Sequence, residues 1–119
     1  MSETAGSPRY DLEDRTFAFA RDCRAFVKLL PRTICNIEDV KQLVRSSGSV
    51  GANYIEANEA HSQKDFKYRI RVCRKEAKES AYWLRLLDTG DNAELESERR
   101  RLIQEANELK HIFGAIATK

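Results

Sequence analysis

Along most of this chain, apolar residues return every three or four positions, which is the spacing of one face of an α-helix. The pattern breaks at Pro31, before Ser62 and at the turn of residues 89–92, leaving four segments of roughly 19 to 27 residues. With only two Pro and five Gly in 119 residues, the chain lacks the turn residues of an all-β sandwich. We therefore predict an all-α fold, an antiparallel up-down four-helix bundle, because helices of this length joined by short loops pack most simply in that way.

Capping residues mark where the later helices are expected to begin. Asn36 is placed to cap the second helix. Ser62, followed three residues later by Asp65, forms a capping-box-like pair at the start of the third. Gly90 is placed to end the third helix, and residue 91 or 92 to cap the fourth.

The first ten residues carry no such periodicity. They are polar, so we predict a disordered N-terminal tail over residues 1–10 and a single four-helix domain over residues 11–119. No apolar run approaches the roughly 18 residues of a membrane span, and the N-terminus lacks the apolar stretch of a secretory signal. The three cysteines form no C-x-x-C pair, which disfavours a disulfide framework and a zinc knuckle. We expect a cytoplasmic protein with reduced thiols.

Residues able to carry catalysis or bind a metal are few. His61 precedes the third helix, and His111 lies about 180° from the apolar stripe of the fourth, so it faces solvent. Glu108 and His111 match the Glu-x-x-His pattern of di-iron bundles, but such a site needs two of these motifs and two further glutamates. Cys23 and Cys73 fall on apolar stripes, where burial raises the pKa of a thiol and makes it inert. We expect no catalytic residue, no metal site and no cofactor, and hence no enzyme.

Small residues interrupt the middle of the second helix. Ser47 and Gly51 lie at the centre of its apolar stripe, and Tyr54 and Asn58 continue this mixed small and polar face. Since glycine costs about 1 kcal/mol against alanine inside a helix, its presence favours close approach of a neighbouring helix, within the bundle or across a subunit contact. A phosphate-cradling loop is disfavoured because no strand precedes the glycines and no lysine follows them.

Charge is distributed unevenly along the chain. Residues 63–90 have eight basic and four acidic side chains, whereas residues 36–62 have two basic and four acidic. At about 100° per residue, seven of the eight cations and Tyr82 fall within one arc of about 100°, opposite the apolar stripe and away from all four acids. The cations of this basic stripe are Lys64, Lys67, Arg71, Arg74, Lys75, Lys78 and Arg85.

Two interpretations of the basic stripe stand side by side. A face of one charge sign forgoes the i,i+4 ion pairs of an ordinary solvated helix surface, which favours an electrostatic footprint for polyanions. Alternatively, glutamates of a neighbouring helix or subunit, such as Glu94, Glu96 and Glu98, neutralise it. Insertion into a membrane surface is disfavoured because the opposite apolar face is needed for the core.

The second and third helices together resemble a known family. Residues 45–57 are similar to the R-x-x-x-S-V/I-x-x-N-I/Y-x-E-A/G signature of the bacterial four-helix bundle proteins, also called 23S rRNA intervening-sequence proteins, and residues 64–66, 74–80 and 82–87 continue the match. The resemblance implies homopentameric, barrel-like rings of up-down bundles. A relative, the accessory variability protein of diversity-generating retroelements, has a basic surface, binds nucleic acid and engages a reverse transcriptase.

Together, the residues and the resemblance predict a non-enzymatic homo-oligomer, a pentamer by the resemblance, that binds RNA or DNA through the basic stripe, with Tyr82 stacking on a base. A reverse transcriptase partner follows by family analogy alone. The resemblance also extends the expected packing role of Ser47, Gly51, Tyr54 and Asn58 to a tight subunit contact. The alternative is a structural or protein-interaction module whose basic stripe is neutralised at the subunit interface, with no nucleic-acid role.

Overall fold

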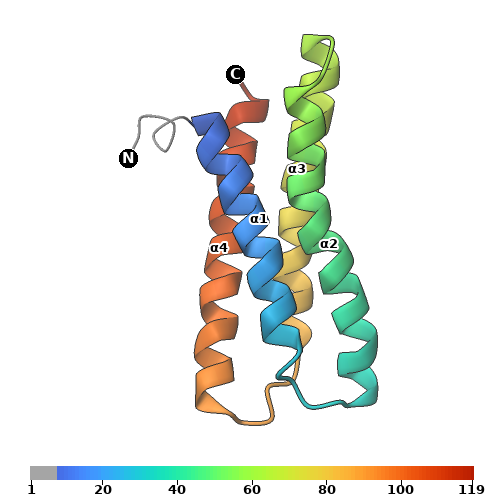
Figure 1. Ribbon diagram of the computed structural model, residues 1–119, viewed down its shortest axis with the longest axis vertical. Helices are drawn as coiled ribbons and strands as arrows, with labels where there is room; N and C mark the ends of the chain where they lie inside the picture. Colours follow the sequence, from blue (N-terminus) through green and yellow to red (C-terminus); the bar gives the residue numbers. More distant parts are fainter. Residues whose placement is uncertain (1–7) are drawn as a thin grey trace.

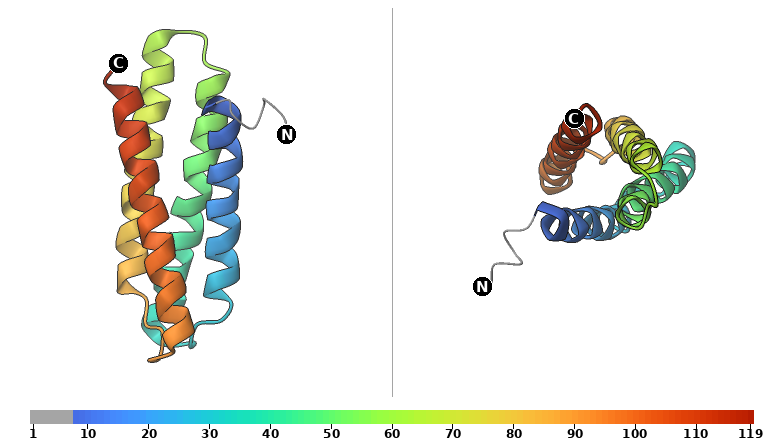
Figure 2. Two further views of the ribbon diagram at one scale, coloured as in Figure 1. Left: turned by 90° about the vertical axis from the view of Figure 1, so that its left-hand side faces the viewer. Right: turned by 90° about the horizontal axis from the view of Figure 1, so that it is seen from above.

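Four α-helices joined by short loops make up the fold (Figure 1). The computed structural model describes residues 8–119, so most of the predicted N-terminal tail lies outside the described residues. The helices are α1 (Pro8–Val27), α2 (Ile34–Asn58), α3 (Gln63–Leu86) and α4 (Ala93–Ala117). Their direction alternates along the chain, and α1 and α3 each pack against both α2 and α4 (Figure 2). The described part of the chain contains no strand, and the predicted all-α four-helix bundle is confirmed.

The helix ends follow the expected caps with two corrections, the first being that α3 ends at Leu86 and not at Gly90. Ser62 and Asn92 cap α3 and α4 as predicted, and each side chain accepts a hydrogen bond at 3.0 Å from a backbone N–H three residues further on. Gly90 adopts a positive φ of 67° in the turn between these helices, which glycine does without strain. The prediction that Asn36 caps α2 is wrong. Thr33 is the cap, and its hydroxyl accepts the N–H of Asn36 at 3.0 Å.

The core is built from one apolar stripe of each helix. Phe19 and Phe26 of α1 and Phe113 of α4 are among its largest fully buried side chains. Tyr54 of α2 packs on Phe113 with 5.7 Å between the ring centroids. Burying an apolar side chain of this size contributes roughly 1.5–3 kcal/mol. Helices α2, α3 and α4 also contribute Leu43, Val50, Ile70, Cys73, Leu84, Leu102 and Leu109.

Helix α1 lies close against α2 at Gly51. A Cβ atom at this position would stand 2.9 Å from Oγ1 and 3.2 Å from Cβ of Thr16. Thr16 is itself buried, and its hydroxyl donates a hydrogen bond to the Leu12 carbonyl at 2.8 Å. Ser47 is also fully buried and lies beside Cys23 of α1. In this chain, these small residues of α2 therefore make room for α1.

Asn36 joins the two loops at one end of the bundle (Figure 1). The residue is only 2% exposed. Its Nδ2 donates to the carbonyls of Pro31 and Asp88, both at 2.9 Å, and its Oδ1 accepts the Asp88 N–H at 2.9 Å. The α1–α2 loop and the α3–α4 loop are thus bridged by one side-chain amide.

Substituting Gly51 by Ala should destabilise the protein, because the added methyl group would overlap the buried Thr16. We expect a loss of about 1 kcal/mol, the net of an overpacking penalty of about 1–3 kcal/mol and a gain of about 1 kcal/mol in helix propensity. The measurement is chemical denaturation monitored by circular dichroism.

Gly48→Ala is the matched control for Gly51→Ala. A Cβ at Gly48 would meet only the guanidinium at the end of the long Arg24 side chain, with 3.1 Å to Nη2. We therefore expect Gly48→Ala to be neutral or stabilising by up to about 1 kcal/mol. Equal effects of the two substitutions would contradict the close packing of α1 on Gly51.

Replacing Asn36 by Ala should cost about 2–4 kcal/mol, since it removes three buried hydrogen bonds and leaves loop backbone groups without partners. Thermal and urea unfolding would measure the change. Gln42→Ala, which removes an exposed amide from the same helix, should change stability by less than about 0.5 kcal/mol. A similar, small effect of both substitutions would rule out the bridging role of Asn36.

Candidate functional site

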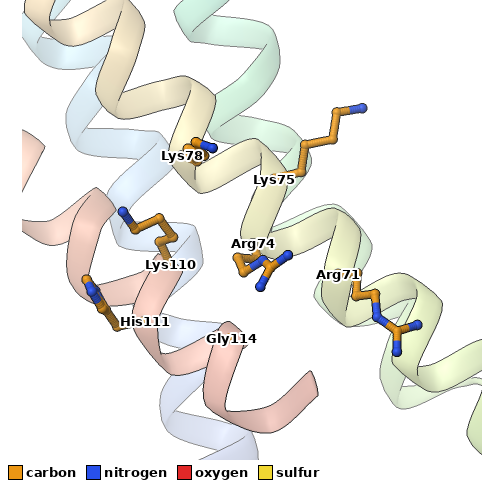
Figure 3. Close-up of a pocket in the computed structure, with 7 residues that line it drawn as sticks. All are labelled: Arg71, Arg74, Lys75, Lys78, Lys110, His111 and Gly114. Atoms are coloured by element: carbon orange, nitrogen blue, oxygen red, sulfur yellow. The ribbon is translucent and has the colours of Figure 1, made fainter. Parts of the chain in front are cut away.

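A hollow of about 750 Å³ lies between α3 and α4 (Figure 3). Almost every side chain that lines it is basic. Four of the lining residues come from α3 and three from α4. They are Arg71, Arg74, Lys75, Lys78, Lys110, His111 and Gly114. We call this surface the α3–α4 basic hollow.

The helical repeat and one glycine account for the shape of the α3–α4 basic hollow. Arg71, Arg74 and Lys78 follow one another at intervals of three or four residues, so their side chains are neighbours on one side of α3. Gly114 has no side chain to fill the hollow from the α4 side. A Cβ at this position would lie 3.5 Å from Cδ of Arg74. His111 is exposed, as predicted, and its Nδ1 lies 2.9 Å from the Asn107 carbonyl oxygen.

The cations of the α3–α4 basic hollow are unpaired. Among the described residues, no ion pair or hydrogen bond involves the side chain of any Arg or Lys that lines it. Several cations elsewhere on the bundle are instead matched to carboxylates. Arg15 of α1 reaches Glu105 of α4 at 2.7 Å, and hydrogen bonding to Glu105 raises the pKa of the Arg15 guanidinium. The hollow therefore concentrates positive charge that the rest of the fold does not neutralise.

Two carboxylates in the middle of α3 face the other way, toward α2. Oε1 of Glu76 and Oε1 of Glu79 each lie 3.8 Å from the guanidinium of Arg45. The hydroxyls of Ser46 and Ser80 form a buried hydrogen bond of 2.9 Å beside this group. At its centre, helix α3 thus places Glu76 and Glu79 against α2 and the cations of the hollow beside α4, whereas Arg69 donates to Oδ1 of Asn53 on α2.

The other predicted members of the basic stripe extend along α3 outside the hollow. Lys64 lies exposed in its first turn, and Lys67 donates a hydrogen bond to the Lys119 carbonyl at 2.5 Å. Arg85 is exposed in the last turn. Tyr82 is half exposed and meets Trp83 edge to face, with 5.1 Å between the ring centroids. The structure therefore brings four of the seven predicted cations into one hollow and leaves three on its flanks.

The contribution of α4 was missed by sequence reasoning. His111 was recognised as facing away from the core, but Lys110 and Gly114 were not considered. The signal was present, because Lys110 and Gly114 stand at helical spacing, four residues apart, on the same helix. The sequence did not show which face of α4 packs against α3.

The four residues predicted to pack helices or subunits lie in different surroundings. Ser47 and Gly51 face α1, and Tyr54 belongs to the core. Asn58 is half-buried at the end of α2, where its Nδ2 donates to Oε2 of Glu13 at 2.8 Å.

No second centre of chemistry stands out in the described residues. Burial raises the pKa of the Cys23 and Cys73 thiols to about 12, whereas Cys35 is exposed. Within residues 8–119, no three His, Cys, Asp or Glu side chains gather into a group that could hold a metal ion. None of the described helices combines the length and the apolarity that a membrane span requires.

Comparison with known proteins places this fold in a family. Residues 10–115 match the family model described as 23S rRNA-intervening sequence protein. The chain belongs to the 23S rRNA-intervening sequence protein family. The resemblance predicted from α2 and α3 is thereby confirmed. Comparison with curated proteins finds no match.

A solved structure supports the same assignment for this 23S rRNA-intervening sequence protein. It is a crystal structure of a protein of unknown function from the S23 ribosomal protein family of Bacteroides thetaiotaomicron, with 26% sequence identity and a TM-score of 0.76. The alignment covers 93% of this chain and 98% of that one. The similarity therefore extends over the whole bundle.

The burial of Cys23 and Cys73 predicts unequal thiol reactivity, because the thiolate is the reactive form. In the native protein, we expect an aromatic disulfide reagent to modify Cys35 rapidly and the other two only after unfolding. Absorbance of the released thiol measures this. The Cys35→Ser variant should show almost no native reactivity, and rapid modification of two or more native thiols would contradict the assignment.

Proposed function

We propose that this protein is a non-enzymatic, homo-oligomeric nucleic-acid-binding protein and that it binds the phosphates of RNA or DNA with the α3–α4 basic hollow. The observation that carries the proposal is the set of cations in one hollow with no carboxylate partner among the described residues. An ordinary charged helix surface pairs its cations with nearby acids. The cations of the α3–α4 basic hollow have no such acids nearby, so their partner would be a polyanion from outside the chain.

The chemistry of the lining residues suits a phosphate backbone. Arg71 and Arg74 each offer a planar guanidinium that can donate two parallel hydrogen bonds to phosphate oxygens, and Lys75 and Lys78 add flexible point charges. Lys110 supplies a further cation from α4. Phosphate contacts carry no sequence information, so selectivity at this surface would depend on shape or strandedness.

Exposed apolar side chains support assembly into a homo-oligomer. Phe17 and Leu29, from α1 and the loop after it, and Ile34 of α2 are between 67% and 84% exposed. Large apolar side chains exposed to this degree on a small protein favour contact with another subunit. We propose the pentameric ring of the family resemblance as that assembly. Repetition of the basic hollow around a ring would strengthen weak phosphate contacts through avidity.

The alternative function is a structural or interaction module whose basic stripe is neutralised by a neighbouring subunit. Two of the three glutamates suggested for this role, Glu96 and Glu98, already have partners within the chain. Hydrogen bonding to Arg99 lowers the pKa of Glu96, and Glu98 contacts Arg101 at 2.7 Å. Neutralising the stripe would therefore require these pairs to break, which favours the polyanion proposal. Within the alternative, Glu94 is the remaining candidate.

Charge reversal of Arg71 and Arg74 tests the proposed function. The double substitution Arg71→Glu/Arg74→Glu should weaken binding of RNA and DNA and lower the slope of log affinity against log salt by about 1.4 to 1.8, the loss of two phosphate contacts. Fluorescence anisotropy across a salt titration measures both. Light scattering should show the same oligomer before and after substitution.

Arg32→Glu/Arg100→Glu is the matched control for this charge reversal. It changes the net charge by the same amount at exposed positions outside the hollow, so the slope should stay near that of the unmodified protein. Unchanged affinity of Arg71→Glu/Arg74→Glu would reject the site. If Arg71→Glu/Arg74→Glu dissociates the oligomer and the unmodified protein binds no nucleic acid, the structural or interaction module would be established instead.

A further inference from the structure

Two exposed tyrosines stand at either end of the cationic part of α3. Tyr68 is 58% exposed and Tyr82 is 53% exposed. They are 14 residues apart, which is about 21 Å along an α-helix, and Lys75 lies midway between them. At about 100° per residue, the two positions differ by only about 40° around the helix. Both rings therefore lie on the same outer side of α3.

Each ring has one neighbour that supports it. The guanidinium carbon of Arg69 lies 5.9 Å from the centroid of the Tyr68 ring. Tyr82 contacts Trp83 edge to face, with an angle of 75° between the ring planes. Because each ring still exposes more than half of its surface, a planar group can stack on it.

The cations lie between the two tyrosines in an arrangement that a strand can follow. Arg71, Arg74, Lys75 and Lys78 all fall between positions 68 and 82. In Figure 3, Lys75 extends away from α4, and Lys78 and Lys110 both line the hollow. The positive surface thus continues from the hollow onto the outer side of α3, where the tyrosines are.

We infer that the ligand of this surface is a single-stranded nucleic acid, whose phosphates lie over the cations while unpaired bases stack on Tyr68 and Tyr82. The inference rests on the proposed function and adds the class of ligand. Aromatic side chains stack on bases of a single strand, whereas the bases of a duplex are already stacked on each other. At about 3.4 Å per nucleotide in a stacked strand, the distance between the tyrosines corresponds to roughly six nucleotides.

An oligonucleotide without bases separates stacking from charge. We would compare three probes of about 12 nucleotides per strand, twice the span above: oligo(dT), an abasic strand with the same phosphates, and a duplex. The protein should bind oligo(dT) more tightly than the other two. Tyr68→Ala and Tyr82→Ala should each weaken oligo(dT) binding about fivefold or more and leave binding of the abasic strand unchanged.

Conservative and remote variants control for structural effects. Tyr68→Phe and Tyr82→Phe keep the ring and should keep the affinity for oligo(dT). Ile55→Ala removes an apolar side chain of similar exposure (54%) from α2, outside the basic hollow and the proposed subunit contact, and should have no effect on binding. Circular dichroism and light scattering would show that each variant keeps its fold and its oligomeric state.

The outcomes distinguish this inference from the proposed function. Equal affinity of the unmodified protein for oligo(dT) and the abasic strand, with a steep salt dependence, would overturn the inference and leave the proposed function standing. Tighter binding of the duplex than of oligo(dT) would have the same meaning. No binding of any probe at about 50 mM salt, where phosphate contacts are strong, would overturn both.

Discussion

Helix α3 packs its apolar stripe between α2 and α4, and this packing fixes the direction of the charged groups at its centre. With Ile70 and Leu84 buried, the helical repeat turns Glu76 and Glu79 toward α2, where Arg45 lies. The cations are turned toward α4 and solvent. Helix α4 meets them with basic side chains and a glycine. The positive charge of the hollow is therefore a consequence of how the core is packed.

The helices and most of their ends were predictable because the relevant interactions are local. Periodicity acts within a turn or two, and a cap such as Ser62 or Asn92 binds an N–H three residues away. Asn36 was misassigned because its partners are not local. One of them, Asp88, is 52 residues further along the chain, and only the packed bundle brings the two together. Thr33, which is closer to the loop, takes the capping role instead.

The candidate site was also predictable only where local interactions decide it. The α3 half follows from the spacing of its cations, so it was predictable as a stripe. The α4 half depends on which face of α4 meets α3, and side-chain packing across the whole bundle decides that. Lys110 and Gly114 could therefore not be assigned from periodicity alone. The exposure of Tyr68, by contrast, follows from periodicity, because this position lies only about 40° around the helix from Tyr82, opposite the apolar stripe.

The bridge through Asn36 also bears on how the bundle moves. Since one amide holds both the α1–α2 loop and the α3–α4 loop, neither helical hairpin can fray at this end without releasing the other. The two loops therefore form one cooperative unit in local opening. The amide hydrogen of Asp88 exchanges with solvent only when that unit opens. At the opposite end, separate contacts hold the helices in pairs: Asn58 of α2 donates to Glu13 of α1, and Lys67 of α3 donates to the carbonyl of Lys119, which follows α4.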